Sequence, residues 1–350
     1  MSRKLLTLSL AATLMGGTAY ADTPQVAVDI APVHSLVARV MEGVGTPDLI
    51  VQPGASPHEY SLRPSEAAAL QNADLVFWIG PDLTPWLTDT IETLAPDAAV
   101  TALLEADGTI ELEFREGALF EAHDHDDHGK EDDHKDHAEE GHKAEGHDNH
   151  AEDGHGDHAE EEAGHDLHGE DEAGHEGHDH GAHDPHAWLS PRNAITWLNV
   201  IAGQLSAADP ENAGAYFANA AAGRVEIEAL IGEVTATLDP VRDGQFVVFH
   251  DAYQYFESDF NFPASGAISI GDASDPSPAR IAEIQARIAE QGINCVLAEP
   301  QFNSGLVATV LDGTEARTGI LDPLGSDLEP GPALYTQLIR NLSTELAGCM

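Results

Sequence analysis

The stretch PENAGAYFANAAAGRVEIEALIGEVTATL, residues 210–238, decides how the rest of the chain can fold. It is rich in Ala and has no Pro after its first position, so it predicts one unbroken helix. A helix of about 29 residues is roughly 43 Å long, which suits a rigid connection between two lobes better than a helix inside one lobe. Apolar runs alternate with helical patterns on both sides of it, as in α/β lobes with parallel sheets.

The elements expected around this helix follow from hydrophobic periodicity. Strands are predicted at 25–30, 47–51 and 74–80, and then at 245–250, 266–270, 294–300 and 318–325. Helices are predicted at 33–44, 63–73, 190–209 and 277–292. Ser190 is placed as an N-cap with Pro191 at the first helical position. We therefore expect a first lobe at 22–209, a linking helix at 210–239 and a second lobe at 240–350.

An insertion interrupts the first lobe at residues 121–184, where 25 acidic side chains and 16 of the 20 His gather. Leu167 is its one large apolar side chain, so it cannot bury enough surface to order itself without a bound ion. A Gly-His-x-x-His phrase recurs in it. The accessory weak metal ligands predicted there are His147, His150, His155, His158, His165, His168, His175 and His178.

The N-terminus has the pattern of a secretory signal peptide. Arg3 and Lys4 precede a short apolar run that ends in the small-x-small sequence Ala19-Tyr20-Ala21, so residues 1–21 are predicted to be removed. The apolar run is too short to favour the alternative, a membrane anchor. We expect a mature protein in the periplasm.

Cys295 and Cys349 are the chain's two cysteines. In an oxidising compartment such a pair favours one disulfide, and the absence of C-x-x-C spacing disfavours a thiolate metal site.

The net charge and the histidines outside the insertion indicate what kind of ligand the chain binds. Acidic residues outnumber Lys and Arg by 62 to 15, giving a formal net charge of −47, so we expect no nucleic-acid partner and favour a cation. His58, His186 and His250 stand where apolar runs give way to loops, and ligands bind at such strand ends in α/β sheets. Three imidazoles and one oxygen suit Zn²⁺, and Asp322 is the candidate oxygen. No two of these His lie close in sequence, so spacing alone fits scattered core histidines equally well. His34 lies in a helical pattern and is read as a core or surface histidine.

Several motifs together resemble the zinc-specific, ZnuA-type solute-binding proteins of bacterial ABC importers. These are GASPHEYSLRPSEAAALQNADLVFWIGPDL, the acidic His-rich insertion, DPHAWLSP, FVVFHDAYQYF, CVLAEPQF and LDPLGSDLEPGPALY, and they cover essentially the whole mature chain. The resemblance implies two α/β lobes joined by a long rigid helix, with metal held between them by His58, His186 and His250. It also implies the Cys295–Cys349 disulfide.

The resemblance further implies a choice of metal. Manganese-binding relatives have Glu where this chain has His250, so a nitrogen ligand here favours zinc over a manganese-type receptor. Some zinc-binding members have an acidic residue before the first His, whereas Pro57 stands here. The fourth ligand is therefore either Asp322, which aligns with an aspartate ligand of the manganese-binding relatives, or a water. Glu59 is read as an exposed acid or as a group that orients a ligand.

The function predicted is high-affinity capture of Zn²⁺ by a monomer that docks transiently on a membrane ABC permease. The insertion would be an accessory arm for zinc capture and hand-over, because a tethered tract near the cleft has a high effective concentration. The alternatives are a periplasmic zinc store or buffer, a manganese-type receptor and a zinc hydrolase. The hydrolase is disfavoured because no H-E-x-x-H or G-x-S-x-G motif is present, so no enzyme activity is expected.

Overall fold

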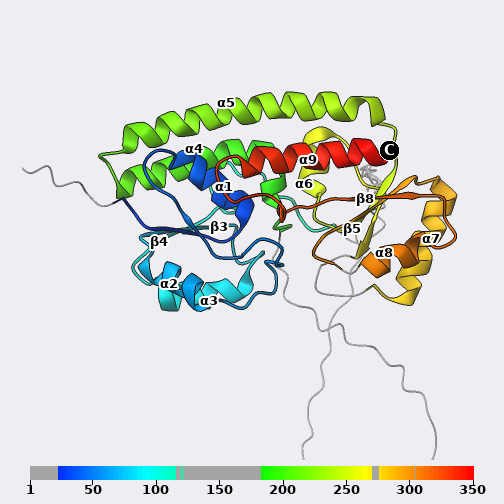
Figure 1. Cartoon of the computed structure of the whole chain (residues 1–350), viewed down its shortest axis with the longest axis horizontal. Coiled ribbons are helices and arrows are strands. Elements are labelled where there is room, and N and C mark those ends of the chain that lie inside the picture. Colours follow the sequence, from blue (N-terminus) through cyan, green and yellow to red (C-terminus); the bar gives the residue numbers. More distant parts are fainter. Residues whose placement is uncertain (1–22, 116–119, 121–182, 270–275, 303) are drawn as a thin grey trace, which may run out of the picture. The chain divides into compact units, whose positions relative to one another are not determined.

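The computed structural model of the chain is described for residues 23–115, 120, 183–269, 276–302 and 304–350 (Figure 1). The predicted signal peptide and the accessory histidines from His147 to His178 lie outside these residues. Within them, the strands form two parallel sheets of four strands each, and the two sheets have the same topology. This arrangement confirms the predicted two-lobed α/β class.

The first sheet has the order β2-β1-β3-β4. Its strands and helices are β1 Val26–Val28, α1 Ala31–Val40, β2 Asp48–Leu49, α2 Pro64–Asn72, β3 Leu75–Trp78, α3 Pro85–Leu94 and β4 Ala99–Ala102. The register pairs Val26 with Leu75 and Leu75 with Ala99. β1 and β3 are wholly buried and apolar, as expected for central strands of a sheet covered on both faces.

The second sheet has the order β6-β5-β7-β8. Its elements are β5 Phe246–His250, α6 Gln254–Phe260, β6 Ala267–Ser269, α7 Pro278–Gln291, β7 Cys295–Ala298, α8 Ser304–Leu311, β8 Arg317–Ile320 and α9 Leu334–Cys349. Phe246 pairs with Cys295, and Cys295 with Arg317. β5 occupies the place in this sheet that β1 occupies in the first.

Along the chain, the elements that follow β4 and precede β5 are η1 Ala187–Leu189, α4 Pro191–Ala208, α5 Ala213–Leu238 and η2 Asp239–Val241. The predicted cap of α4 is present, because the Ser190 side chain accepts a hydrogen bond from Asn193 N and Pro191 follows it. The predicted linking helix corresponds to α5, which begins at Ala213, three residues later than expected.

Helix α5 packs against other helices along one side. One stripe of it is buried, through Tyr216, Ala220, Gly223, Ile227, Leu230, Val234 and Leu238, and it packs along α4, α1 and α9 (Figure 1). A Cβ at Gly223 would lie 3.1 Å from Leu198 and 3.3 Å from Arg39. The absence of a side chain at Gly223 therefore lets α5 approach both neighbouring helices closely. The connection between the lobes is a packed helix layer.

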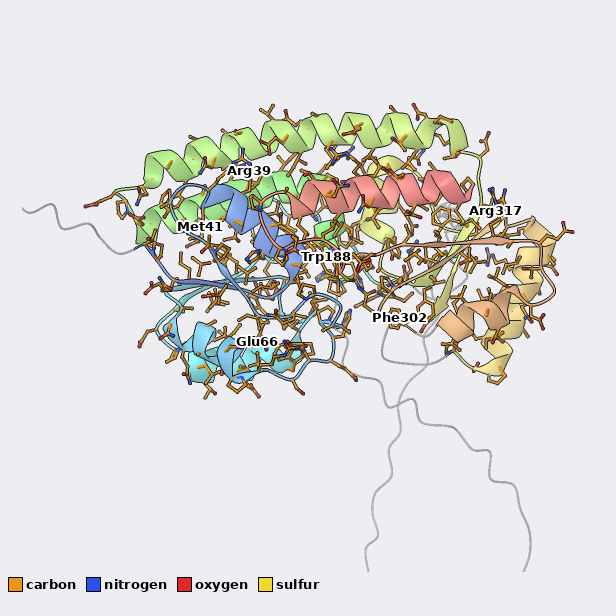
Figure 2. All side chains as sticks on the ribbon, in the orientation of Figure 1. Arg39, Met41, Glu66, Trp188, Phe302 and Arg317 are labelled. Carbon is orange, nitrogen blue, oxygen red and sulfur yellow. A yellow bond between two sulfur atoms is a disulfide. The ribbon has the colours of Figure 1, made fainter. Side chains whose placement is uncertain are left out.

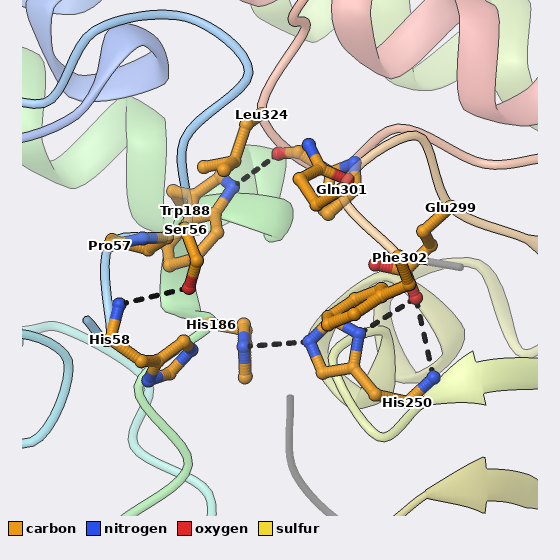
Figure 3. A pocket seen from close by; sticks show the side chains of 11 residues that line it. Ser56, Pro57, His58, His186, Trp188, His250, Glu299, Gln301, Phe302 and Leu324 are labelled. Atoms are coloured by element: carbon orange, nitrogen blue, oxygen red, sulfur yellow. Dashed lines mark hydrogen bonds and ion pairs between the residues drawn. The ribbon is translucent and has the colours of Figure 1, made fainter. Parts of the chain in front are cut away.

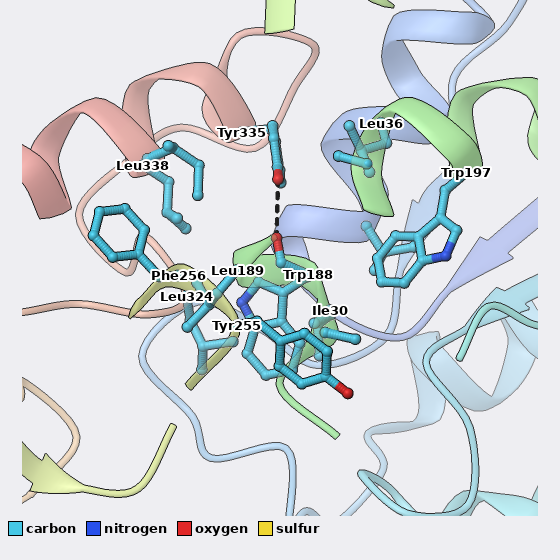
Figure 4. Close-up of a cluster of buried hydrophobic side chains, with 14 of the residues drawn as sticks. Ile30, Leu36, Trp188, Leu189, Trp197, Tyr255, Phe256, Leu324, Tyr335 and Leu338 are labelled. Atoms are coloured by element: carbon cyan, nitrogen blue, oxygen red, sulfur yellow. Dashed lines mark hydrogen bonds between the residues drawn. The ribbon is translucent and has the colours of Figure 1, made fainter. Parts of the chain in front are cut away.

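The largest hydrophobic core contains side chains from both lobes. Figure 4 shows its centre, where Trp188 and Leu36 of the first lobe lie among Phe256 and Leu338 of the second. Tyr335 OH, at the start of α9, donates a hydrogen bond of 3.0 Å to Trp188 O. Since buried apolar contacts and this hydrogen bond cross between the lobes, the lobes share one core.

The C-terminus is fastened to the second sheet. Cys295 at the start of β7 and Cys349 at the end of α9 form a disulfide with Cα atoms 5.7 Å apart, which confirms the predicted pairing. Arg317 of β8, labelled in Figure 2, also donates a hydrogen bond to Met350 O. In the described part of the chain, no helix is long and apolar enough to cross a membrane.

Candidate metal centre

The three histidines predicted as ligands line one pocket (Figure 3). His58 lies in the loop between β2 and α2, His186 directly precedes η1, and His250 is the last residue of β5. Apolar side chains of Pro57, Trp188, Phe302, Pro323 and Leu324 form much of the wall, and the space open to the centre of a water-sized particle is about 20 Å³. A single water needs roughly 10–15 Å³, so the pocket suits one small ion.

His250 is oriented by a carboxylate from the neighbouring strand. Its Nδ1 lies 2.7 Å from Glu299 Oε1, and its backbone N donates to the same oxygen at 3.3 Å. Glu299 follows the end of β7, which pairs with β5. A carboxylate at Nδ1 favours the tautomer with the proton on Nδ1, which leaves Nε2 as the nitrogen able to bind a metal.

His186 has the same arrangement in the first lobe. Its Nδ1 lies 2.7 Å from Asp184 Oδ1, and its backbone N donates to that oxygen at 3.0 Å. Both side chains are buried. The sequence places Asp184 in the acidic insertion, whereas the structure places it inside the fold, where Asp184 N donates to Leu112 O at 2.8 Å. His183 and Asp184 therefore belong to the fold, and the predicted insertion extends two residues too far.

The two nitrogens that face away from the carboxylates lie close together. His186 Nε2 and His250 Nε2 are 3.4 Å apart. Two nitrogens bound at 2.0–2.1 Å to a tetrahedral zinc ion are separated by about 3.3–3.4 Å. The spacing therefore matches that of two ligands of one zinc ion.

The His58 ring lies beside this pair. Its ring centroid lies 5.5 Å from that of His186, with the planes tilted by 52°, and it is half-buried. Across the described residues, no three His, Cys, Asp or Glu side chains already converge as a metal site. Trp86 Nε1 donates to Pro57 O at 2.8 Å, which holds the loop beside the pocket.

Asp322 is not brought to the histidines. Its oxygens accept hydrogen bonds from the backbone N of Leu324, Gly325 and Ser326, from Ser326 Oγ and from Gln301 Nε2. It caps the turn after β8 and lines a different cavity. Gln301 and Leu324, which it holds, do line the histidine pocket, so its visible contribution to the site is indirect.

Other predicted residues have plainer roles. His34 is buried in α1 with Nε2 3.1 Å from Pro47 O, and burial lowers its pKa. It is a core histidine, as expected. Glu59 is exposed.

Several carboxyl groups near the pocket are buried. Burial raises the pKa of Asp184 to about 7, and burial also raises the pKa values of Asp251 and Glu257, against the opposing effect of Arg115. A cation in the pocket would favour the charged forms of these carboxyl groups.

Comparison with known proteins gives the family. Residues 26–349 match the family described as zinc-uptake complex component A, periplasmic, abbreviated ZnuA. The chain belongs to the ZnuA family. It is 50% identical over 325 residues to the high-affinity zinc uptake system protein ZnuA of Brucella abortus strain 2308, covering 93% of this chain and 91% of that protein. It is 43% identical over 333 residues to the ZnuA protein of Paracoccus denitrificans strain Pd 1222, covering 95% and 93% of the two chains.

Solved structures have the same fold. A crystal structure of ZnuA superposes with a TM-score of 0.67 at 20% identity, covering 94% of this chain and 99% of that one. A zinc-bound ZnuA deletion mutant gives 0.66 at 21% identity, with 94% and 98% coverage. The Mn²⁺ complex of FpvC from Pseudomonas aeruginosa gives 0.68 at 17% identity, with 93% and 98% coverage. At these identities the likeness extends to the fold, which is common to proteins crystallised with different metals.

Proposed function

We propose that this chain is the zinc receptor of a high-affinity uptake system, which captures Zn²⁺ and delivers it to a membrane ABC permease. Membership of the ZnuA family and the names of relatives up to 50% identical support this function. The observation that carries it is the 3.4 Å separation of His186 Nε2 and His250 Nε2, each with a carboxylate at Nδ1.

The proposed zinc ligands are His58, His186 and His250. Two of them are preset at ligand spacing, and zinc would draw the His58 ring, on its loop, to complete the set. The fourth position is assigned to a water in preference to Asp322, because the Asp322 carboxylate already accepts five hydrogen bonds in its turn. Neutral imidazoles are ligands that zinc favours.

A manganese-type receptor is less well supported. Mn²⁺ prefers oxygen ligands, and the two preset ligand atoms are both nitrogens. The carboxylates of Asp184 and Glu299 face the far side of the imidazole rings, where they orient the ligands rather than bind the ion.

A zinc hydrolase is the least supported alternative. A component of an uptake complex passes on its ligand unchanged, and the family described for residues 26–349 is such a component.

The His-rich tract is proposed as an arm that captures zinc and hands it over. The described residues on either side of it are Phe120 and His183, and Asp184 contacts the proposed ligand His186 directly. A tract tethered there keeps any captured ion at high effective concentration near the pocket. A zinc store, in which the tract itself is the working site, would instead bind several ions weakly.

The family description favours a periplasmic location, to which the predicted signal peptide at residues 1–21 would direct the chain. We further propose that it acts as a monomer and docks on the permease transiently.

A competitive zinc titration tests the function. The mature chain lacking residues 123–181, which keeps His183 and Asp184, is compared with the same protein carrying His250→Ala. One tight zinc ion that is lost with the substitution supports the receptor. Tight binding that disappears with the deletion alone would instead establish the zinc store.

A further inference from the structure

An arginine of the first lobe reaches into the second beside the pocket. Arg115 follows β4 on a segment held to α4, where Ile110 N donates to Asn193 Oδ1 at 2.7 Å and Asn193 Nδ2 donates to Ile110 O at 3.0 Å. The Arg115 guanidinium contacts two carboxylates of the second lobe, Asp251 and Glu257.

Both contacts are multiple and largely buried. Arg115 Nε lies 3.0 Å from each oxygen of Asp251, and Nη2 donates to Asp251 as well. Nη1 and Nη2 donate to the two oxygens of Glu257 at 2.7 and 3.1 Å. The Asp251 and Glu257 side chains are 8% and 5% exposed. Such forked pairs fix geometry more strictly than a single point charge does.

The position of Asp251 connects this cluster to the metal site. Asp251 directly follows His250, so the guanidinium holds the backbone at the end of β5 against the first lobe. The ligand pair itself spans the lobes, because His186 belongs to the first and His250 to the second. Tyr255 adds a neutral tie between the same parts, since its OH donates to Asp184 O at 2.8 Å and accepts from Leu112 N at 2.9 Å.

We propose that Arg115 is a positioning residue for the metal site, which holds His250 at ligand spacing from His186 by clamping Asp251 and Glu257 to the first lobe. This role rests on the proposed zinc-binding function. It assigns Arg115 no contact with the ion.

The sign of the effect separates positioning from charge. A guanidinium near the pocket repels a dication, so its removal should strengthen zinc binding if charge alone mattered. If Arg115 positions His250, its removal should weaken binding, by roughly tenfold as for other groups that orient metal ligands. The two explanations therefore predict changes in opposite directions.

The experiment uses the full mature chain with Arg115→Met and Arg115→Lys. Zinc affinity is measured by chelator competition, zinc release by a chelator chase, and site geometry by the absorption spectrum of the Co²⁺-loaded protein. We expect about tenfold weaker binding, faster release and an altered Co²⁺ spectrum for Arg115→Met. Arg115→Lys should recover part of the loss, because an ammonium keeps the charge but not the fork. Arg340→Met is the matched control, since Arg340 makes a forked pair with Glu233 on exposed helix surfaces.

Loss of one cation leaves two buried carboxylates unpaired, so Arg115→Met could fail to fold. The double variant Arg115→Met, Glu257→Gln removes one charge of each sign, so the net charge beside the pocket is unchanged and charge alone predicts no weakening; circular dichroism checks its fold. Folded protein with weakened zinc binding supports the proposal. Affinity equal to or above that of the unaltered chain, in either folded variant, overturns it. If His250→Ala leaves tight binding intact, the proposed function fails instead, whatever Arg115 does.

Discussion

Replacing Glu299 by Leu removes the carboxylate that orients His250 while keeping a side chain of similar size. Glu299 Oε1 accepts from both Nδ1 and the backbone N of His250, so the substitution removes both constraints. The imidazole can then place its proton on Nε2, where it blocks the metal. Groups that orient metal ligands are typically worth 10–100-fold in affinity, or about 1.4–2.7 kcal/mol. We expect zinc binding to weaken by this amount.

The assay is zinc competition against a chromophoric chelator at pH 7.5, with the His250 tautomer read by long-range ¹H–¹⁵N correlation of the metal-free protein. Glu299→Gln retains an oxygen acceptor and should lose less affinity than Glu299→Leu. Asp209→Asn is the control, because Asp209 is also buried and accepts from Tyr216 OH at 2.9 Å, but it does not line the pocket. Binding by Glu299→Leu within about twofold of the unaltered chain would refute the role of the carboxylate.

Three further outcomes are expected. Asp322→Asn should change zinc affinity by less than about threefold, because Asp322 acts through its turn; a loss of tens of fold in the same titration would make it a ligand. Zinc affinity should rise with pH from 5.5 to 7.5 by at least roughly tenfold, since the ligand imidazoles must be neutral. Asp184, whose pKa burial raises to about 7, should also release its proton to solvent as the dication binds. A pH-independent affinity would contradict the expected rise. Titration calorimetry in buffers of different ionisation enthalpy measures the proton release, and a binding enthalpy that does not depend on the buffer would contradict that release. Replacing Cys295 and Cys349 by Ser should lower the free energy of unfolding by about 4 kcal/mol, from the entropy of the closed loop; an unchanged urea midpoint would show that the disulfide adds nothing.

The sequence was most informative where burial and periodicity act together. β5 and β7 are short apolar runs in a parallel sheet, and α4 carries its own cap at Ser190. The edge strand β4, Ala99–Ala102, has an exposed or half-exposed pattern without the apolar signal of a central strand. Helix α3 contains three Thr, a weak helix former. Neither was predicted, because neighbouring elements rather than local propensity stabilise them.

For the site, sequence position indicated the residues proposed as ligands better than the carboxylates that orient them. His250 follows an apolar strand directly, and the structure places it at the end of β5. Glu299 carries a similar signal after the apolar run of β7 and could have been found by it. Asp184 could not, since it stands at the end of a tract full of acidic residues. Asp322 satisfied the same strand-end rule as His250, but backbone N–H groups of its own turn occupy its oxygens.

The apolar lining of the pocket has a consequence for how an ion enters it. An aqueous divalent ion carries a shell of water molecules, and the largely apolar walls of the pocket offer few polar groups to replace them. An ion held by the proposed ligands must therefore exchange most of its water for imidazole nitrogens. Mg²⁺ gives up its water reluctantly and gains little from imidazole. The chain would thus reject Mg²⁺ through the cost of dehydration, without any side chain that recognises it.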